Sequence, residues 1–150
     1  MVIAVDFDGT IVEHAYPEIG KPIPFALAVL KKLQQEEHHT LLLWTVREGD
    51  LLQEAVDYCS KNGLEFDAVN KNYPEEEEGV EARKLIADVY IDDKNIGGLP
   101  EWGTIYNTIV SGSIYFQDID DYVSDNKPQK KKNLFTKLGE AWDTAQKYKQ

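Results

Sequence analysis

The stretch Val2-Ile3-Ala4-Val5-Asp6-Phe7-Asp8-Gly9-Thr10 decides the fold, because it joins a short apolar run directly to acidic and small residues. Four consecutive apolar residues predict a strand that is buried on both faces, as in a parallel sheet covered by helices. Asp6 and Asp8 alternate with Phe7, so their side chains can point the same way at the strand end before the chain turns at Gly9. The stretch therefore predicts a buried strand that ends in a pair of carboxylates.

Apolar runs and helical patterns alternate through the following hundred residues. Further buried strands are predicted over 41–44, 66–69 and 89–91, and helices after Pro24, after Asp50 and over 80–87, whereas residues 104–110 fit a helix or a strand equally. Strands that alternate with helices predict an α/β fold with a mostly parallel sheet. Because the crossovers are right-handed, the strands end at one edge, beyond which such sheets bind ligands.

Composition limits the class of protein. The chain has 150 residues, of which 42% are apolar and 11% aromatic, enough for one domain with a hydrophobic core. Its net charge of −11 disfavours nucleic acid as a partner, because phosphate contacts need a basic surface. A single cysteine excludes a disulfide framework, and no apolar run approaches the ~20 residues of a membrane span. We expect a soluble, cytoplasmic protein that makes no membrane contact.

The charge is distributed unevenly along the chain. Residues 127–150 contain seven lysines and two acidic residues, whereas residues 1–126 carry most of the acidic residues. Within the last segment four apolar residues recur at helical spacing: Phe135, Leu138, Trp142 and Ala145. We therefore predict a catalytic body over 1–126 and a basic amphipathic tail over 127–150, which docks on the body or contacts another subunit.

Residues suited to chemistry follow three of the predicted strands, and the topology brings them to one edge: Asp6 and Asp8, Thr45 and Arg47, and Asp92 and Asp93. Lys84 precedes the last of these strands. Four carboxylates with a single lysine would repel a phosphate, so the cluster requires a bound cation. Oxygen ligands without a nearby His or Cys favour Mg²⁺. The residues alone therefore predict Mg²⁺-assisted phosphoryl transfer, with a carboxylate available as nucleophile.

Four ordered motifs resemble those of the haloacid dehalogenase (HAD) superfamily of phosphotransferases. The segment from Asp6 to Thr10 resembles the first motif, Thr45 the second, Lys84 the third and Asp92-Asp93 the fourth. The resemblance covers roughly residues 1–110. It implies a three-layer Rossmann-like sandwich with strand order 3-2-1-4-5. Neither gap between the motifs is long enough for a cap domain, so the chain resembles a capless member with an open site.

The resemblance implies a role for each catalytic residue. Asp6 is expected to attack phosphorus and form an aspartyl-phosphate. Asp8 is expected to protonate the leaving oxygen and then to activate the hydrolytic water. Thr45 is expected to hydrogen-bond the transferring phosphoryl group, and Lys84 to pair with Asp6 and the phosphate oxygens, with Lys71 as a weaker candidate for the third motif.

The same resemblance implies ligands for the metal, and the position of Arg47 after Thr45 suggests a further contact. Gly9 and Thr10 are expected to contact the substrate. Arg47 either grips a phosphate or an acidic substrate group with its two-pronged guanidinium, or forms a surface salt bridge with Glu48. Mg²⁺ is expected on the Asp6 carboxylate, the Asp8 main-chain carbonyl and Asp92, with Asp93 binding directly or through water.

The predicted function is Mg²⁺-dependent hydrolysis of a small phosphomonoester, either a sugar phosphate or a nucleotide. Asp8 favours hydrolysis, because a carboxylate at this position can deprotonate water. One alternative is a non-catalytic protein that binds Mg²⁺ and phosphate and contacts a partner. Another is a nucleic-acid end phosphatase, which an open site admits but the acidic charge disfavours. A neighbouring subunit can also cover a capless site, so a homo-oligomer is a further expectation.

Overall fold

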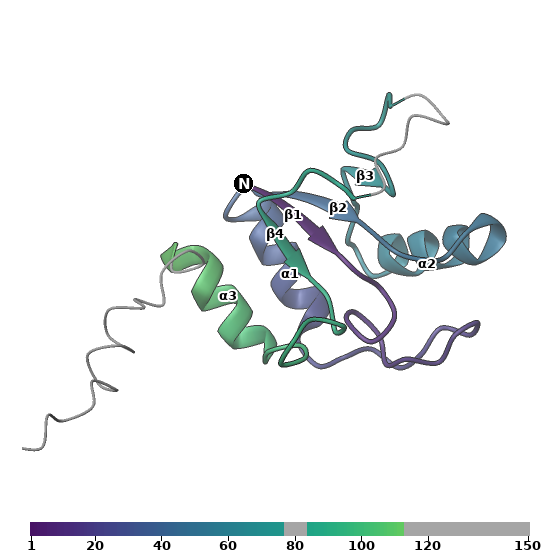
Figure 1. Ribbon diagram of the computed structural model, residues 1–150, viewed down its shortest axis with the longest axis horizontal. Coiled ribbons are helices and arrows are strands. Elements are labelled where there is room, and N and C mark those ends of the chain that lie inside the picture. The colour runs from purple at the N-terminus through teal and green to yellow at the C-terminus, as the bar shows by residue number, and fades with distance from the viewer. Residues whose placement is uncertain (77–83, 113–150) are drawn as a thin grey trace, which may run out of the picture. The chain divides into compact units, whose positions relative to one another are not determined.

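The computed structural model describes residues 1–76 and 84–112, which lie in the first of the two units into which the chain divides, Met1–Ile114. The predicted tail over 127–150, with its apolar stripe, and the predicted boundary at residue 126 lie outside these residues. Along the chain the elements are β1 (Val2–Val5), α1 (Ala26–Gln35), β2 (Thr40–Leu43), α2 (Gly49–Lys61), β3 (Ala68–Val69), β4 (Val89–Ile91) and α3 (Trp102–Ser111) (Figure 1).

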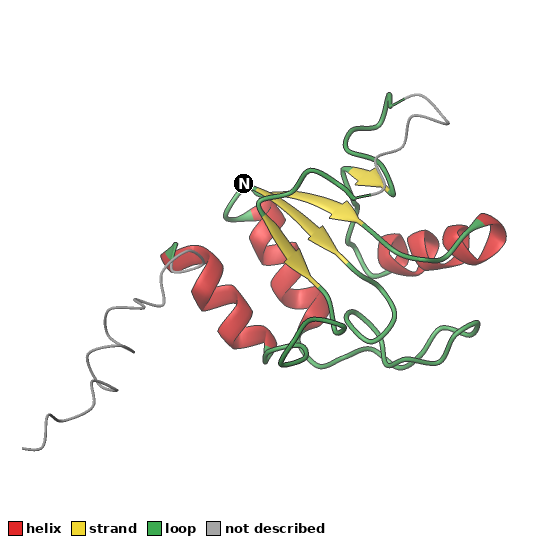
Figure 2. Cartoon of the chain, in the orientation of Figure 1, coloured by secondary structure: helices red, strands yellow, loops and turns green. Residues whose placement is uncertain are grey.

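The strands form one parallel sheet in the order β3-β2-β1-β4 (Figure 2). Val5 pairs with Leu43 on one side and with Ile91 on the other, so β1, β2 and β4 end at the same edge. This confirms the predicted α/β fold and its parallel sheet. Within the described residues a fifth strand is not seen.

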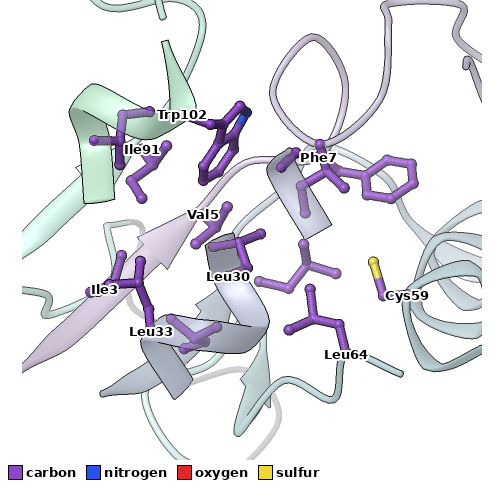
Figure 3. Close-up of a cluster of buried hydrophobic side chains, with 14 of the residues drawn as sticks. Ile3, Val5, Phe7, Leu30, Leu33, Cys59, Leu64, Ile91 and Trp102 are labelled. Carbon is purple, nitrogen blue, oxygen red and sulfur yellow. The ribbon is translucent and has the colours of Figure 1, made fainter. Parts of the chain in front are cut away.

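Alternate strand residues face two hydrophobic clusters, one on each side of the sheet. Ile3 and Val5 lie in the larger cluster, to which α1, α2 and α3 contribute, for example through Leu30, Cys59 and Trp102 (Figure 3). The opposite face carries a smaller cluster: Ala4, Leu42, Ala68 and Leu85. Over 1–76 and 84–112 no helix contributes to this smaller cluster, so the third layer of the predicted sandwich is not part of the described fold.

The segment over 104–110, which fitted a helix or a strand, lies in α3. Its buried residues Trp102, Ile105 and Ile109 recur every three or four positions, which is the period of one helix face, and the helix packs against α1. Gly112, with a φ of 71°, ends the helix in the left-handed conformation that glycine adopts without a steric penalty.

The prediction of a helix over 80–87 is wrong for residues 84–87. Residues 80–83 lie outside the described structure, and residues 84–87 are not helical. The Ile86 N–H donates to Asn72 Oδ1 at 2.6 Å, and the Tyr90 hydroxyl donates to the Leu85 carbonyl. The Ile86 N–H, which a helix would pair with a carbonyl four residues earlier, is thus satisfied by a side chain fourteen residues away, while Leu85 is buried in the smaller cluster.

The connection from β1 to β2 contains a closed loop and α1, and no cap domain is inserted there. We call residues 13–21 the 13–21 loop. At its base the Glu13 N–H donates to the Lys21 carbonyl at 2.7 Å. A Cβ on Gly20 would lie 1.8 Å from the Glu13 carbonyl oxygen, so the two sides of the base approach too closely for any other residue at position 20.

Of the helices in the described part of the chain, none is both long enough and apolar enough to span a bilayer.

Candidate active site

The carboxyl ends of β1 and β4 bring three carboxylates together. Asp6 directly follows β1, and Asp92 and Asp93 directly follow β4. The Asp6 N–H donates to the Ile91 carbonyl at 3.0 Å, which continues the strand pairing to the edge of the sheet. One carboxylate oxygen of each of the three residues lies within 4.8 Å of the other two, and all three residues are half-buried. We call Asp6, Asp92 and Asp93 the carboxylate cluster.

Thr10 and Gly9 join the first motif to the fourth. The buried Thr10 hydroxyl donates to Asp6 Oδ2 at 3.1 Å and accepts from the Asp93 N–H at 3.1 Å. Gly9 has a φ of +90°, and a Cβ there would lie 2.4 Å from Asp93 Oδ2. Any side chain at position 9 would therefore displace Asp93. Of the predicted substrate-binding residues, Thr10 therefore links two members of the cluster and Gly9 leaves room for Asp93.

The environment of Asp6 disfavours its charge. Burial raises the pKa of Asp6 to about 6, although hydrogen bonds from the Phe7 N–H and the Thr10 hydroxyl act in the opposite direction. The negative charges of Asp92 and Asp93 add to the upward shift. Ionisation of Asp6 beside Asp92 and Asp93 is therefore unfavourable in the metal-free protein. A bound cation would stabilise its charged form.

The donor atoms of the cluster fit Mg²⁺. They are all carboxylate oxygens, which hard divalent cations prefer. Asp93 Oδ1 is buried and accepts no hydrogen bond from the described residues, so it lacks the partner that a buried carboxylate oxygen normally has. A cation would supply that partner.

The ammonium group beside the cluster belongs to Lys94, a residue that the motif pattern did not indicate. Lys94 Nζ lies 2.5 Å from Asp93 Oδ2. The hydrogen bond to Asp93 raises the pKa of Lys94, and the charges of Asp93, Asp6 and Asp92 act in the same direction. Its side chain is 71% exposed. Its position directly after Asp92-Asp93 was the available signal in the sequence.

Lys84 does not pair with the cluster in the described structure. Its ammonium lies 4.5 Å from the centroid of the Tyr90 ring. Across residues 1–76 and 84–112, no ion pair links Lys84 to a carboxylate. Tyr90 packs with the smaller hydrophobic cluster, on the face of the sheet opposite Ile91. The predicted contact between Lys84 and Asp6 depended on a helix ending before β4, and residues 84–87 are not helical.

Asp8 and Arg47 form a buried ion pair. Arg47 Nε donates to Asp8 Oδ2 at 2.7 Å, and Arg47 Nη2 donates to Asp8 Oδ1 at 2.8 Å. The Arg47 side chain is fully buried and the Asp8 side chain is 5% exposed. The hydrogen bonds that Arg47 donates to Asp8 raise the pKa of Arg47. Arg47 therefore forms neither the surface salt bridge with Glu48 nor an open phosphate-binding group, because Asp8 occupies its guanidinium.

Thr45 lies at the same edge of the sheet, two residues beyond β2. The Trp44 N–H donates to the Val5 carbonyl at 2.8 Å, which continues the β1–β2 pairing and places Thr45 beside the end of β1. The Thr45 N–H donates to Asn70 Oδ1 at 2.9 Å, and its hydroxyl accepts from the Arg47 N–H at 3.3 Å. Asn70 thus fixes the backbone at Thr45.

A solved structure provides a relative of this chain. A conserved protein from Bacteroides thetaiotaomicron is 60% identical to it, with a TM-score of 0.70, and the match covers 78% of this chain and 98% of that protein. This chain belongs to the family of that Bacteroides protein. No protein-family model matches the chain, and no curated protein matches it. The name of the Bacteroides protein states only that it is conserved, so this membership supports the α/β fold without indicating an activity.

Proposed function

We propose that this protein is a Mg²⁺-dependent phosphomonoester hydrolase of the HAD type, acting on a small phosphorylated metabolite such as a sugar phosphate or a nucleotide. The observation that carries the proposal is the convergence of Asp6, Asp92 and Asp93 within 4.8 Å at the carboxyl edge of a parallel sheet. Ligands of α/β proteins bind at this edge. The resemblance of the four sequence motifs supports the same reaction.

Asp6 acts as the nucleophile. An oxygen of its carboxylate forms a bond to phosphorus while the bond from phosphorus to the ester oxygen breaks, which yields an aspartyl-phosphate and the free alcohol. Water then attacks phosphorus while the bond from phosphorus to the Asp6 oxygen breaks, which releases inorganic phosphate and the free Asp6 carboxylate. The Thr10 hydroxyl, which donates to Asp6 Oδ2, orients the carboxylate for the attack.

Asp8 transfers protons in both steps. Its protonated form donates a proton to the leaving alcohol, and the resulting carboxylate, the form that pairs with Arg47 in this structure, accepts one from the hydrolytic water. Both of its oxygens contact Arg47, so its orientation at the first motif is fixed. Thr45, held at the edge by Asn70, donates a hydrogen bond to the phosphoryl group.

The carboxylate cluster would hold Mg²⁺, which when bound would neutralise the carboxylates and polarise a phosphoryl oxygen. Without a cation the negative charges of Asp6, Asp92 and Asp93 would repel a phosphate dianion. Lys94 offsets part of this charge through its contact with Asp93.

The proposal also includes further details of the fold and the cellular location of the reaction. We include a fifth strand beside β4, giving the order 3-2-1-4-5, a third layer of helices and the absence of a cap domain. We also include action on a free metabolite in the cytoplasm, with nucleic acid disfavoured by the net charge of −11.

The decisive experiment is hydrolysis of a phosphomonoester panel by the full chain, with Mg²⁺ or with EDTA. The panel includes sugar phosphates, nucleotides and a 5′-phosphorylated oligonucleotide. We expect turnover that requires Mg²⁺ and that Asp6→Asn abolishes. The matched control is Asp57→Asn, which removes an exposed carboxylate on α2 and should leave turnover unchanged. Full turnover by Asp6→Asn would refute the proposal.

A second candidate is a non-catalytic protein that binds Mg²⁺ and phosphate. Two observations favour it: the Lys84 ammonium lies on the Tyr90 ring, and both oxygens of Asp8 are occupied by Arg47. Calorimetric binding of Mg²⁺ and inorganic phosphate by a protein that hydrolyses no member of the panel would support this candidate. Selective turnover of the oligonucleotide would instead indicate an end phosphatase.

A further inference from the structure

Arg47 reaches beyond its ion pair with Asp8. Its Nη1 donates to the Pro17 carbonyl at 2.9 Å, and its Nη2 also donates to the Glu18 carbonyl at 2.9 Å. The Arg47 guanidinium carbon lies 5.3 Å from the centroid of the Tyr16 ring and 5.2 Å from the centroid of the Phe7 ring. One fully buried side chain therefore contacts the first motif and the 13–21 loop together.

The 13–21 loop has few other attachments. Residues 13–18 are exposed, and Ile19 is its partly buried apolar contact with the core. Within the described residues, the hydrogen bonds to residues 14–20 are the two that Arg47 donates. The position of the outer part of the loop therefore depends on the Arg47 side chain.

We propose that Arg47 is a positioning residue that couples the Asp8 carboxylate to the 13–21 loop, so that both are held as one unit beside the carboxylate cluster. This inference rests on the proposed function for its kinetic consequence. Four of the five guanidinium N–H groups are used by protein acceptors, which leaves Arg47 unsuited to binding substrate phosphate. The planar, forked guanidinium is needed, since a lysine ammonium cannot contact both Asp8 oxygens and both carbonyls in this geometry.

Limited proteolysis of the full-length protein tests the coupling without any assumption about activity. A protease that cleaves after glutamate is applied to wild type, Arg47→Lys and Arg47→Ala, and the Glu18–Ile19 and Glu65–Phe66 bonds are followed by mass spectrometry. Glu65 lies outside the 13–21 loop and its carbonyl accepts a hydrogen bond from Gln34 Nε2 at 2.6 Å, so cleavage at its bond reports opening elsewhere in the fold. We expect cleavage after Glu18 to accelerate about tenfold or more, because two hydrogen bonds are lost, with little change after Glu65. Equal acceleration at both bonds, or none at either, would overturn the proposal.

Kinetics with p-nitrophenyl phosphate and Mg²⁺ test the consequence for Asp8. Arg47→Lys should lower kcat by about 10²-fold, the effect of a misplaced catalytic group, while KM changes less than about threefold. A large rise in KM with unchanged kcat would show instead that Arg47 binds the substrate.

Millimolar guanidinium, but not ammonium, should restore both kcat and protection after Glu18 in Arg47→Ala, and failure to restore either would count against the coupling. If wild type has no turnover, the proposed function fails, yet the proteolysis still decides whether Arg47 anchors the loop.

Discussion

Asp6 combines burial with two neighbouring negative charges, and both effects raise the pKa of its carboxyl group from 3.8 to about 6. As the pH rises from 4 to 6, the unfolded chain releases this proton before the folded protein does. The unfolded state therefore binds fewer protons in this range, and the contribution of Asp6 to stability falls as the pH rises. Above pH 6 the folded, metal-free protein contains an ionised Asp6 in an unfavourable environment.

Replacing Asp6 by Asn should therefore stabilise the metal-free protein at pH 7.5. We expect Asp6→Asn to raise the Tm in EDTA by about 2–4 °C, the shift that about 1 kcal/mol produces in a chain of this size. The difference should shrink toward pH 5, where Asp6 is mostly protonated. Addition of Mg²⁺ should raise the Tm of wild type more than that of the variant. Calorimetry at pH 7.5 and pH 5 provides the measurement. A Tm difference between variant and wild type that grows as the pH falls would contradict a raised pKa of Asp6.

At the scale of the element, α1 begins at a conformationally costly position. Phe25 precedes its first residue with a φ of 68°, in the left-handed region that non-glycine residues rarely adopt, and makes no side-chain cap hydrogen bond. Its side chain is 74% exposed, so little packing compensates for the strain. Asn tolerates this conformation better, because its short polar side chain can form local hydrogen bonds there.

Phe25→Asn should increase the free energy of unfolding by about 0.5–1 kcal/mol, measured by urea denaturation. The matched control is Tyr73→Asn, which removes another exposed aromatic residue at a position without a positive φ, and should stay within about 0.5 kcal/mol of wild type. Loss of stability in Phe25→Asn would show that the aromatic ring makes a packing contribution that its exposure does not indicate.

At the scale of the whole molecule, the interaction with the longest range is the electrostatic repulsion among acidic side chains. The net charge is −11, and the ion pairs found across residues 1–76 and 84–112 are Lys32–Glu36, Asp8–Arg47 and Lys94–Asp93. Many acidic side chains therefore repel one another across the surface, which destabilises the compact state. The buried Asp8–Arg47 pair is shielded from solvent and should respond little to salt.

Raising KCl from 0.02 M to 0.3 M in EDTA should therefore increase the Tm. The Debye length shortens to below about 10 Å above 0.1 M salt, so repulsion between exposed carboxylates is screened, while the buried pair is not. Thermal unfolding followed by circular dichroism provides the measurement. A Tm that falls with salt would mean that attractive surface pairs outweigh the net repulsion.

Local sequence patterns correctly predicted the strands in which nearly every consecutive side chain is buried. The apolar runs Val2–Val5 and Leu41–Leu43 are strands because nearly every side chain in them is covered on both faces of the sheet. Residues 104–110 could not be assigned as helix or strand from pattern alone, and packing against α1 decides that they are helical. The helix predicted over 80–87 is absent over 84–87, where Leu85 packs into a cluster and Ile86 bonds to Asn72. Such long-range contacts leave no periodic signal.

The sequence by itself determined that Asp6, Asp92 and Asp93 would meet, because each directly follows a buried parallel strand and such strands end at one edge. Asp8 was predicted to join them, but its carboxylate pairs with Arg47 instead. Only the tertiary structure decided the partners of the basic groups. Arg47 is buried against Asp8 and the 13–21 loop, Lys94 contacts Asp93, and Lys84 lies on the Tyr90 ring. Strand ends are fixed by the backbone, whereas a long cationic side chain binds whichever acceptor the folded loops bring within its reach.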